Sequence, residues 1–291
     1  MPDALFCFGL GYSAEAIAAR LARAGWSIAG TGRDPATRAR LERLGYAMAP
    51  FDRERPVAGL DRRLAQTTHL LISVPPDDVG DPVLATHGPV IARARTLRWI
   101  GYLSTTGVYG DSGGAWVDEA TPPRPSNARS VRRAEAEAAW LALGRAADIP
   151  VQVFRLAGIY GPGRSAVDQV RAGTARRIDK PGHLFSRIHV EDIAGALAAS
   201  MARPNPGAIY NVCDDDPAPQ EAVVAHACAL LGVAPPPLVA FADADLSPMA
   251  RSFYVDNRRV RNDRLKRELG VRLRYPSYRD GLAAIAAARS T

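Results

Sequence analysis

The sequence contains almost no lysine. Of its 37 cationic residues only Lys180 and Lys266 are lysines, so the remaining 35 are arginines. The formal net charge is +7, and the sequence pI is near 9.7. The cationic residues are scattered along the whole chain and form no basic run, and a nucleic-acid partner would therefore rest on the pI alone. We do not expect nucleic acid as a partner.

Cysteines and long apolar runs are also scarce. Cys7, Cys213 and Cys228 have no metal-ligand spacing, which predicts buried thiols in a reducing compartment and no metal site. Residues 222–242 carry no formal charge, but His226 and the prolines at 235–237 favour a buried helix followed by an extended segment over a membrane span. The N-terminus lacks the basic lead of a signal peptide. We therefore expect a cytoplasmic protein without a membrane partner.

Short β-rich runs alternate with alanine-rich helical stretches through the first half of the chain. The runs are ALFCFG, WSIAGT, YAMAPF, HLLISVP, LRWIGYLS and VQVFRL. This alternation predicts an α/β fold, a doubly wound parallel (Rossmann) sheet covered by helices on both faces. We place a dinucleotide-binding domain at 1–160 and a smaller, mostly C-terminal substrate lobe at 161–291. Residues near 187–213 are expected to return to the first domain.

The first strand runs directly into a glycine-rich turn. Gly9, Gly11 and Ala14 form a G-x-G-x-x-A arrangement, with Tyr12 and Ser13 opening the next helix. The first glycine permits the turn, the second lets backbone approach a pyrophosphate, and the small third residue lets helix pack on strand. The free N–H groups at the helix start suit phosphates. The turn therefore predicts a dinucleotide cofactor.

The end of the second strand, GTGRDP, predicts which dinucleotide binds. An NAD site usually has an acidic residue here, whereas Thr31 and Arg33 offer a hydroxyl and a cation to a 2'-phosphate. NADP is therefore the expected cofactor, unless Arg33 only caps the loop and Asp34 turns inward. Asp52 is expected near the adenine, and the ribose is expected to contact Ser73, Val74 and Pro75. The alternative for all four residues is ordinary loop structure.

Five motifs in the remaining chain occur in the order of a known family. They are LSTTGVYG, FRLAGIYGPGR, RIHVEDIAGAL, IYNVCDDDPAP and LKRELGVRLRYPSYRDGL. With them the sequence resembles the extended short-chain dehydrogenase/reductases, also called NAD-dependent epimerase/dehydratases. The resemblance implies that Thr105, with Thr106 beside it, bonds the reacting oxygen. It also implies a catalytic Tyr-x-x-x-Lys, and these two positions hold Arg129 and Arg133.

An arginine at position 129 cannot replace the family's tyrosine, because its pKa stays above ~12 and it does not give up its proton. Arg133 can still hold the nicotinamide ribose. The sequence therefore resembles an atypical branch of the family. Dehydratases of this family carry Asp-Glu directly after the threonine, where this chain has Thr106 and Gly107, so dehydration is not expected. Candidate replacement acids are Tyr109, Tyr160 and His189, although tyrosines of such motifs usually pack structurally and a histidine like His189 more often forms a buried hydrogen bond.

Arginines in segments that should face the cleft indicate an anionic or nucleotide-linked small-molecule substrate. They are Arg164, Arg187, Arg251 and Arg258. Taken singly, each could instead cover surface or pair with an acid, as Arg187 could with Glu191 or Asp192. The expected function is an NADP-binding oxidoreductase or epimerase-like enzyme. The alternative is a catalytically silent NADP-binding sensor, and the sequence does not indicate an oligomeric state.

Overall fold

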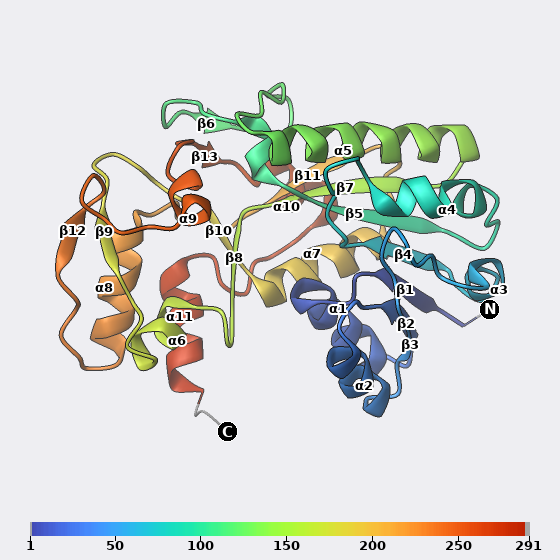
Figure 1. Ribbon diagram of the computed structural model, residues 1–291, viewed down its shortest axis with the longest axis horizontal. Coiled ribbons are helices and arrows are strands. Elements are labelled where there is room, and N and C mark those ends of the chain that lie inside the picture. Colours follow the sequence, from blue (N-terminus) through green and yellow to red (C-terminus); the bar gives the residue numbers. More distant parts are fainter. Residues whose placement is uncertain (1, 289–291) are drawn as a thin grey trace.

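A seven-stranded parallel sheet forms the larger part of the molecule (Figure 1). The computed structural model describes residues 2–288. The strand order is β11-β7-β5-β4-β1-β2-β3, so the chain reverses direction across the sheet between β1 and β4. The strands are β1 (Ala4–Phe8), β2 (Ser27–Thr31), β3 (Ala47–Ala49), β4 (His69–Ile72), β5 (Trp99–Thr105), β7 (Val151–Leu156) and β11 (Ile209–Val212). The predicted doubly wound fold is confirmed.

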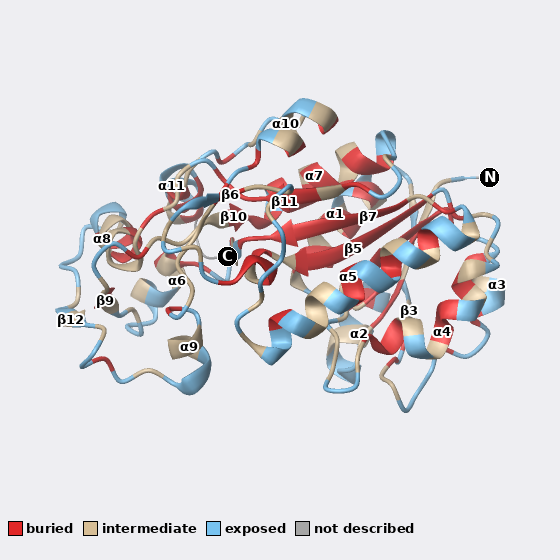
Figure 2. Ribbon diagram, turned by 90° about the horizontal axis from the view of Figure 1, so that it is seen from above, coloured by how far each residue is buried: buried red, intermediate tan, exposed pale blue. Residues whose placement is uncertain are grey.

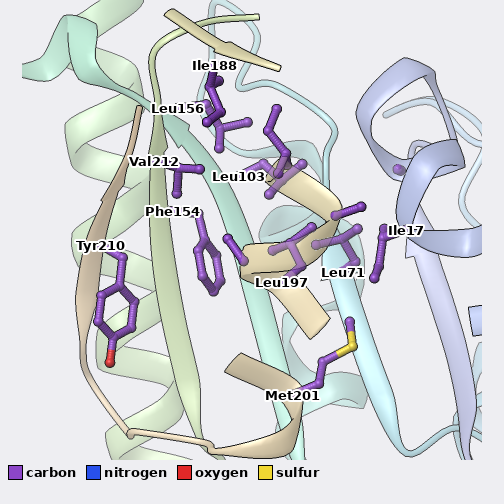
Figure 3. Close-up of a cluster of buried hydrophobic side chains, with 14 of the residues drawn as sticks. Ile17, Leu71, Leu103, Phe154, Leu156, Ile188, Leu197, Met201, Tyr210 and Val212 are labelled. Atoms are coloured by element: carbon purple, nitrogen blue, oxygen red, sulfur yellow. The ribbon is translucent and has the colours of Figure 1, made fainter. Parts of the chain in front are cut away.

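Helices cover both faces of the sheet. One face carries α1 (Tyr12–Arg23), α2 (Pro35–Arg43), α7 (Val190–Ala202) and α10 (Asp263–Leu269), and the other carries α3 (Leu60–Leu64), α4 (Pro82–Ala92) and α5 (Ala128–Ala147). Neighbouring strand residues enter opposite cores because side chains alternate along a strand. Leu71 and Phe154 pack against α1 and α7 (Figure 3), whereas Ile72 packs on the other side. The central strands β1, β4, β5 and β7 are buried along nearly their whole length (Figure 2).

Helix α4 is absent from the sequence prediction, which named no helix between HLLISVP and LRWIGYLS. Its prolines and glycine are poor helix formers, which hides the helix in the sequence. Pro82 stands at the first helical position, where its missing N–H costs nothing, and the carboxylate of Asp81 caps the N–H groups of Val83 and Leu84. Packing against α5 then holds the helix in place.

A smaller lobe lies at the left of Figure 1. Helices α6 (Ala166–Arg171), α8 (Gln220–Leu230) and α11 (Tyr278–Ala287) share one apolar cluster. Around it are α9 (Pro248–Ser252) and three short parallel strand pairs: β8 (Gly158–Tyr160) with β10 (Arg187–His189), β9 (Arg177–Asp179) with β12 (Leu238–Ala240), and β6 (Trp116–Val117) with β13 (Arg259–Val260). The chain thus enters the lobe after β7, returns to the sheet through α7 and β11, and leaves it again.

The uncharged segment 222–242 is the predicted buried helix followed by an extended stretch, since α8 is succeeded by a proline run and β12. Within residues 2–288, no helix has the length and apolar character needed to span a bilayer. All three cysteines are buried with free thiols, as predicted. Among the described residues, no cluster of His, Cys, Asp or Glu could hold a metal ion.

Candidate cofactor and substrate site

The glycine turn after β1 is tightly packed on its inner side. Gly9 has φ +82°, and a Cβ added there would lie 2.9 Å from Val74 Cγ2, so a side chain is excluded on both counts. The Gly9 N–H donates to Thr31 Oγ1 at 2.9 Å. At Gly11, by contrast, an added Cβ would meet no atom of the described residues within 4 Å. The turn is therefore held by close packing at Gly9 and is uncrowded at Gly11, where the backbone must approach a pyrophosphate.

The first turn of α1 supplies the polar groups of this site. Gly11 is the N-cap and provides no side-chain cap, and among the described residues the N–H groups of Tyr12, Ser13 and Ala14 have no acceptor. Ala14 is fully buried, which brings the helix close to the strand. Three oriented N–H groups at the positive end of a helix dipole suit a phosphate. The residues present therefore fit the pyrophosphate of a dinucleotide.

Tyr12 also joins the two halves of the molecule. Its hydroxyl donates to Pro162 O at 3.1 Å, and the guanidinium of Arg164 lies 5.7 Å from the centre of its ring. Burial raises the pKa of Tyr12 to about 12. Besides its place in the glycine turn, this residue therefore contacts the lobe.

Thr31 and Arg33, the residues at the end of β2 that were predicted to bind a 2'-phosphate, lie in different environments. Thr31 is buried, and its hydroxyl is engaged with the glycine turn. Arg33 is exposed, and its side chain has no hydrogen bond within the described chain. Asp34 caps α2 by accepting from the Thr37 N–H at 2.7 Å. Arg33 is therefore the cation that a ligand can reach at this position.

Arg38, which the sequence analysis missed, holds the loop in place of Arg33. Its Nη1 donates to Gly32 O at 2.9 Å and to Arg33 O at 2.8 Å. Arg38 lies about one helical turn after the GTGRDP motif. A helix directs its long side chains back toward its N-terminus, and this position could therefore have indicated a contact with the loop. A second cation thus lies beside the Arg33 backbone.

The other predicted cofactor residues flank the same edge of the sheet. The N–H groups of Ser73 and Val74 donate to Phe8 O at 2.9 and 3.2 Å, which places the exposed Pro75 and its neighbours beside the glycine turn. Asp52 follows β3 and forms a 3.5 Å ion pair with Arg55. All these positions line the carboxyl ends of adjacent strands, the edge where α/β sheets bind ligands.

The chemical end of the site begins where β5 ends. Thr105 Oγ1 accepts from the Gly107 N–H at 3.0 Å, so its own hydroxyl proton remains available to a ligand. Thr106 starts the short 3-10 helix η1 (Thr106–Tyr109) and also lines the cleft. A Cβ on Gly107 would lie 3.3 Å from Thr105 Oγ1 and 3.1 Å from Ser130 Oγ. Ser130, which the sequence analysis missed although it follows Arg129, therefore belongs to this hydroxyl cluster.

The two arginines of α5 both line the cleft but differ in their contacts. Arg133 Nη1 donates to Leu103 O at 2.8 Å and to the Tyr102 hydroxyl at 3.3 Å, which draws it toward the sheet. Arg129 is exposed, with Nη1 2.8 Å from Met249 Sδ and its guanidinium 5.4 Å from the Phe253 ring centre. Arg129 thus presents a charge between the sheet and the lobe.

The three candidate replacement acids all form structural contacts. The Tyr109 hydroxyl donates to Asn211 Oδ1 at 2.8 Å, and the Tyr160 hydroxyl donates to Ser277 O at 3.3 Å. His189 Nδ1 accepts from the Glu191 N–H, and burial lowers the pKa of His189 to about 4. Burial also raises the pKa of both tyrosines. These contacts do not favour any of the three as the proton donor.

A cleft of about 1120 Å³ lies between the sheet and the lobe, and it is rich in arginine. Two carboxylates, Asp168 and Asp256, are among its lining residues. The arginines that line it are Arg129, Arg133, Arg164, Arg176, Arg187 and Arg258. Six guanidinium groups against two carboxylates make this cavity a favourable place for anions.

Two expectations about arginines need correction. Arg251 does not line the cleft, because its Nη2 donates to Ala244 O at 2.8 Å and its guanidinium packs on Phe241. Arg187 does not pair with the acids that follow it. Glu191 instead pairs with Arg274 at 2.7 Å, and Asp192 accepts from the N–H groups of residues 274 and 275.

Comparison with known proteins shows which family this chain resembles. Residues 90–213 match the model of the NAD dependent epimerase/dehydratase family. The solved structure of a conserved protein of unknown function from Silicibacter pomeroyi is similar to this chain, with 54% identity, a TM-score of 0.90 and 98% of each chain covered. The family match supports NAD(P) binding and an oxidoreductase- or epimerase-like role.

Two curated proteins are also similar to this chain. Protein YeeZ of Escherichia coli strain K12 is 28% identical over 276 residues, which cover 92% of this chain and 94% of YeeZ. The 3-diazoavenalumate denitrifying reductase of a Streptomyces species is 29% identical over 180 residues, covering 57% of this chain and 55% of that protein.

Proposed function

We propose that this protein is an NADPH-dependent reductase of a small anionic substrate. The observation that carries the proposal is a permanent cation, Arg129, at the cleft position where the family resemblance places a tyrosine. The N–H groups at the start of α1 would hold the pyrophosphate, and Arg33 would bind the 2'-phosphate. Arg133 would hold the nicotinamide ribose.

The charge at position 129 is compatible with carbonyl reduction in the absence of the family's tyrosine. An arginine neither gives nor takes a proton at physiological pH, so it does not replace the tyrosine as acid or base. Reducing a carbonyl creates an alkoxide, which a fixed cation stabilises as it forms. Water in the open cleft can then protonate the alkoxide, so this direction needs no tyrosine.

The residues around the reacting oxygen have complementary roles in this proposal. When bound, NADPH supplies a hydride to the carbonyl carbon. The free hydroxyl proton of Thr105 donates to the carbonyl oxygen, because the Gly107 N–H already occupies one of its lone pairs. Ser130, on the far side of Gly107, can donate to the same oxygen, and Arg129 offsets the charge that develops there.

The comparison with the Streptomyces protein supports a reductase, since the name of that relative describes a reductase acting on 3-diazoavenalumate. The shared segment covers little more than half of each chain, and the substrate of this chain is therefore argued from its own cleft.

The test begins with the anion that remains bound through purification, identified by mass spectrometry and supplied with NADPH. Thr105→Ala should lower turnover by ~10²-fold while NADPH affinity stays nearly constant, because the hydroxyl faces the substrate. Thr86→Ala is the matched control, since that hydroxyl bonds Pro82 O within α4. If the unaltered protein binds NADPH and the anion but oxidises no NADPH, the reductase is excluded and the silent sensor takes its place.

A further inference from the structure

We propose that Arg187 forms a carboxylate-binding subsite at the lobe end of the cleft, and that the carboxylate it takes is carried on a flat, apolar group. This inference rests on the proposed function, because it names the chemistry of the anion that the reductase would bind. Arg187 belongs to β10 and Thr105 to β5, and both residues line the cleft.

The guanidinium of Arg187 is held in one orientation by backbone. Its Nη1 donates to Phe185 O and to Ala218 O, both at 2.8 Å. These two residues are themselves locked together, since each N–H donates to the other's carbonyl at 3.1 Å. The Nε and Nη2 donors have no acceptor among the described residues, and the side chain lines the cleft. A pre-oriented pair of donors matches the two oxygens of a carboxylate.

Arg187 also lacks a counter-ion. In residues 2–288 no carboxylate lies within 4 Å of it, whereas Arg258 in the same cleft pairs with Asp256 at 3.2 Å. The nearest acidic influence is the buried Asp214 at the end of β11, and burial raises the pKa of Asp214 to about 8. Asp214 is therefore mostly protonated at neutral pH, and Arg187 keeps a net positive charge that a substrate anion can neutralise.

The surroundings of Arg187 are aromatic. The ring of Phe185 lies 5.6 Å from its guanidinium, and Tyr160, Tyr254 and Tyr278 also line the cleft. The charge of one guanidinium matches the charge of one carboxylate. Aromatic walls favour a flat apolar group beside that charge. The combination selects an unsaturated or aromatic carboxylic acid.

The probe is trans-cinnamate, titrated calorimetrically into the protein saturated with NADP. We expect trans-cinnamate to bind at least tenfold more tightly than the neutral cinnamamide. Arg187→Met should weaken trans-cinnamate by at least tenfold, and Arg187→Lys should weaken it less, because lysine keeps the charge but not the planar fork. Arg251→Met is the control, because Arg251 also bonds a lobe carbonyl and packs on an aromatic ring but does not line the cleft.

Thermal melting of each variant checks folding, and Arg187→Lys keeps the test valid if Arg187→Met does not fold. Unchanged trans-cinnamate affinity in the folded Arg187 variants would overturn the subsite, as would tighter binding of phenyl phosphate than of trans-cinnamate to the unaltered protein. Failure of the proposed function has a different signature, since NADPH binding or oxidation is then absent while Arg187 still controls the affinity for trans-cinnamate.

Discussion

Two arginines in the interior of this protein have opposite surroundings. Arg155, on β7, forms a 2.8 Å ion pair with Glu137 of α5, and both side chains are less than 5% exposed. Ser104 donates to the same carboxylate, and the Tyr109 ring lies 4.8 Å from the Arg155 guanidinium. Arg187 is held, within the described part of the chain, by neutral carbonyls. The difference teaches that the charge of Arg155 is balanced inside the fold, whereas no carboxylate of the described chain lies within 4 Å to balance that of Arg187.

The largest expected effect comes from removing the carboxylate of the ion pair between Arg155 and Glu137. Glu137→Gln should lower the free energy of unfolding by about 3–5 kcal/mol, because it leaves Arg155 buried without a counter-ion. Asp214→Asn, the equivalent removal of a carboxylate near Arg187, should cost much less at pH 7, where Asp214 is already mostly protonated. Urea denaturation of both variants measures the difference. Equal losses would contradict the distinction between the two arginines.

A smaller effect is expected at Arg33, an exposed arginine that pairs with no carboxylate of the described residues. Arg33→Ala should remove most of an at least tenfold preference for NADPH over NADH, a ratio that corresponds to ~1.4 kcal/mol. Arg40→Ala is the control, because Arg40 on α2 is paired with Glu15 at 2.7 Å and should not influence the cofactor. Fluorescence titration with both cofactors gives the ratio. Equal affinities in the unaltered protein would refute a role for Arg33.

The smallest effect concerns pH. Burial raises the folded-state pKa of Asp214 to about 8 from its ordinary value of 3.8, so between these values the folded protein holds a proton that the unfolded chain has released. Stability therefore falls as pH rises through this window, by about 1 kcal/mol from pH 6 to 7. The Asp214→Asn variant has no carboxyl group to titrate at this position, so it does not lose stability in this way. Its free energy of unfolding relative to that of the unaltered protein should therefore rise with pH. Denaturation at pH 6, 7 and 9 tests this, and a constant difference would mean that Asp214 titrates normally.

The sequence was sufficient for the fold and for the glycine turn because both depend on local pattern. Strand and helix alternate with clear periodicity, and the glycine spacing after the first strand marks the turn directly in the sequence. Helix α4 escaped prediction because its stability comes from the Asp81 cap and from packing, which outweigh its prolines. Long-range contacts decide the rest.

The arginines of the site show where sequence reasoning ends. Position along the chain suggested that Arg251 faces the cleft, yet a carbonyl seven residues away turns it aside. Arg187 is fixed partly by Ala218, 31 residues later, and nothing in the motif around it indicates that partner. Ser130 joins Thr105 only because α5 packs against the end of β5. Such partners are set by tertiary packing and not by spacing.

The contact between Tyr12 and the lobe also restricts evolution at a distant position. A Cβ at Gly161 would lie 2.5 Å from the Tyr12 hydroxyl and 2.7 Å from Val190 Cγ1, so a side chain at residue 161 would displace both Tyr12 and Val190. Relatives with a larger residue at 161 should therefore have smaller ones at 12 and 190. Substitutions at these three positions should be inherited together, which couples the history of the cofactor turn to that of the lobe.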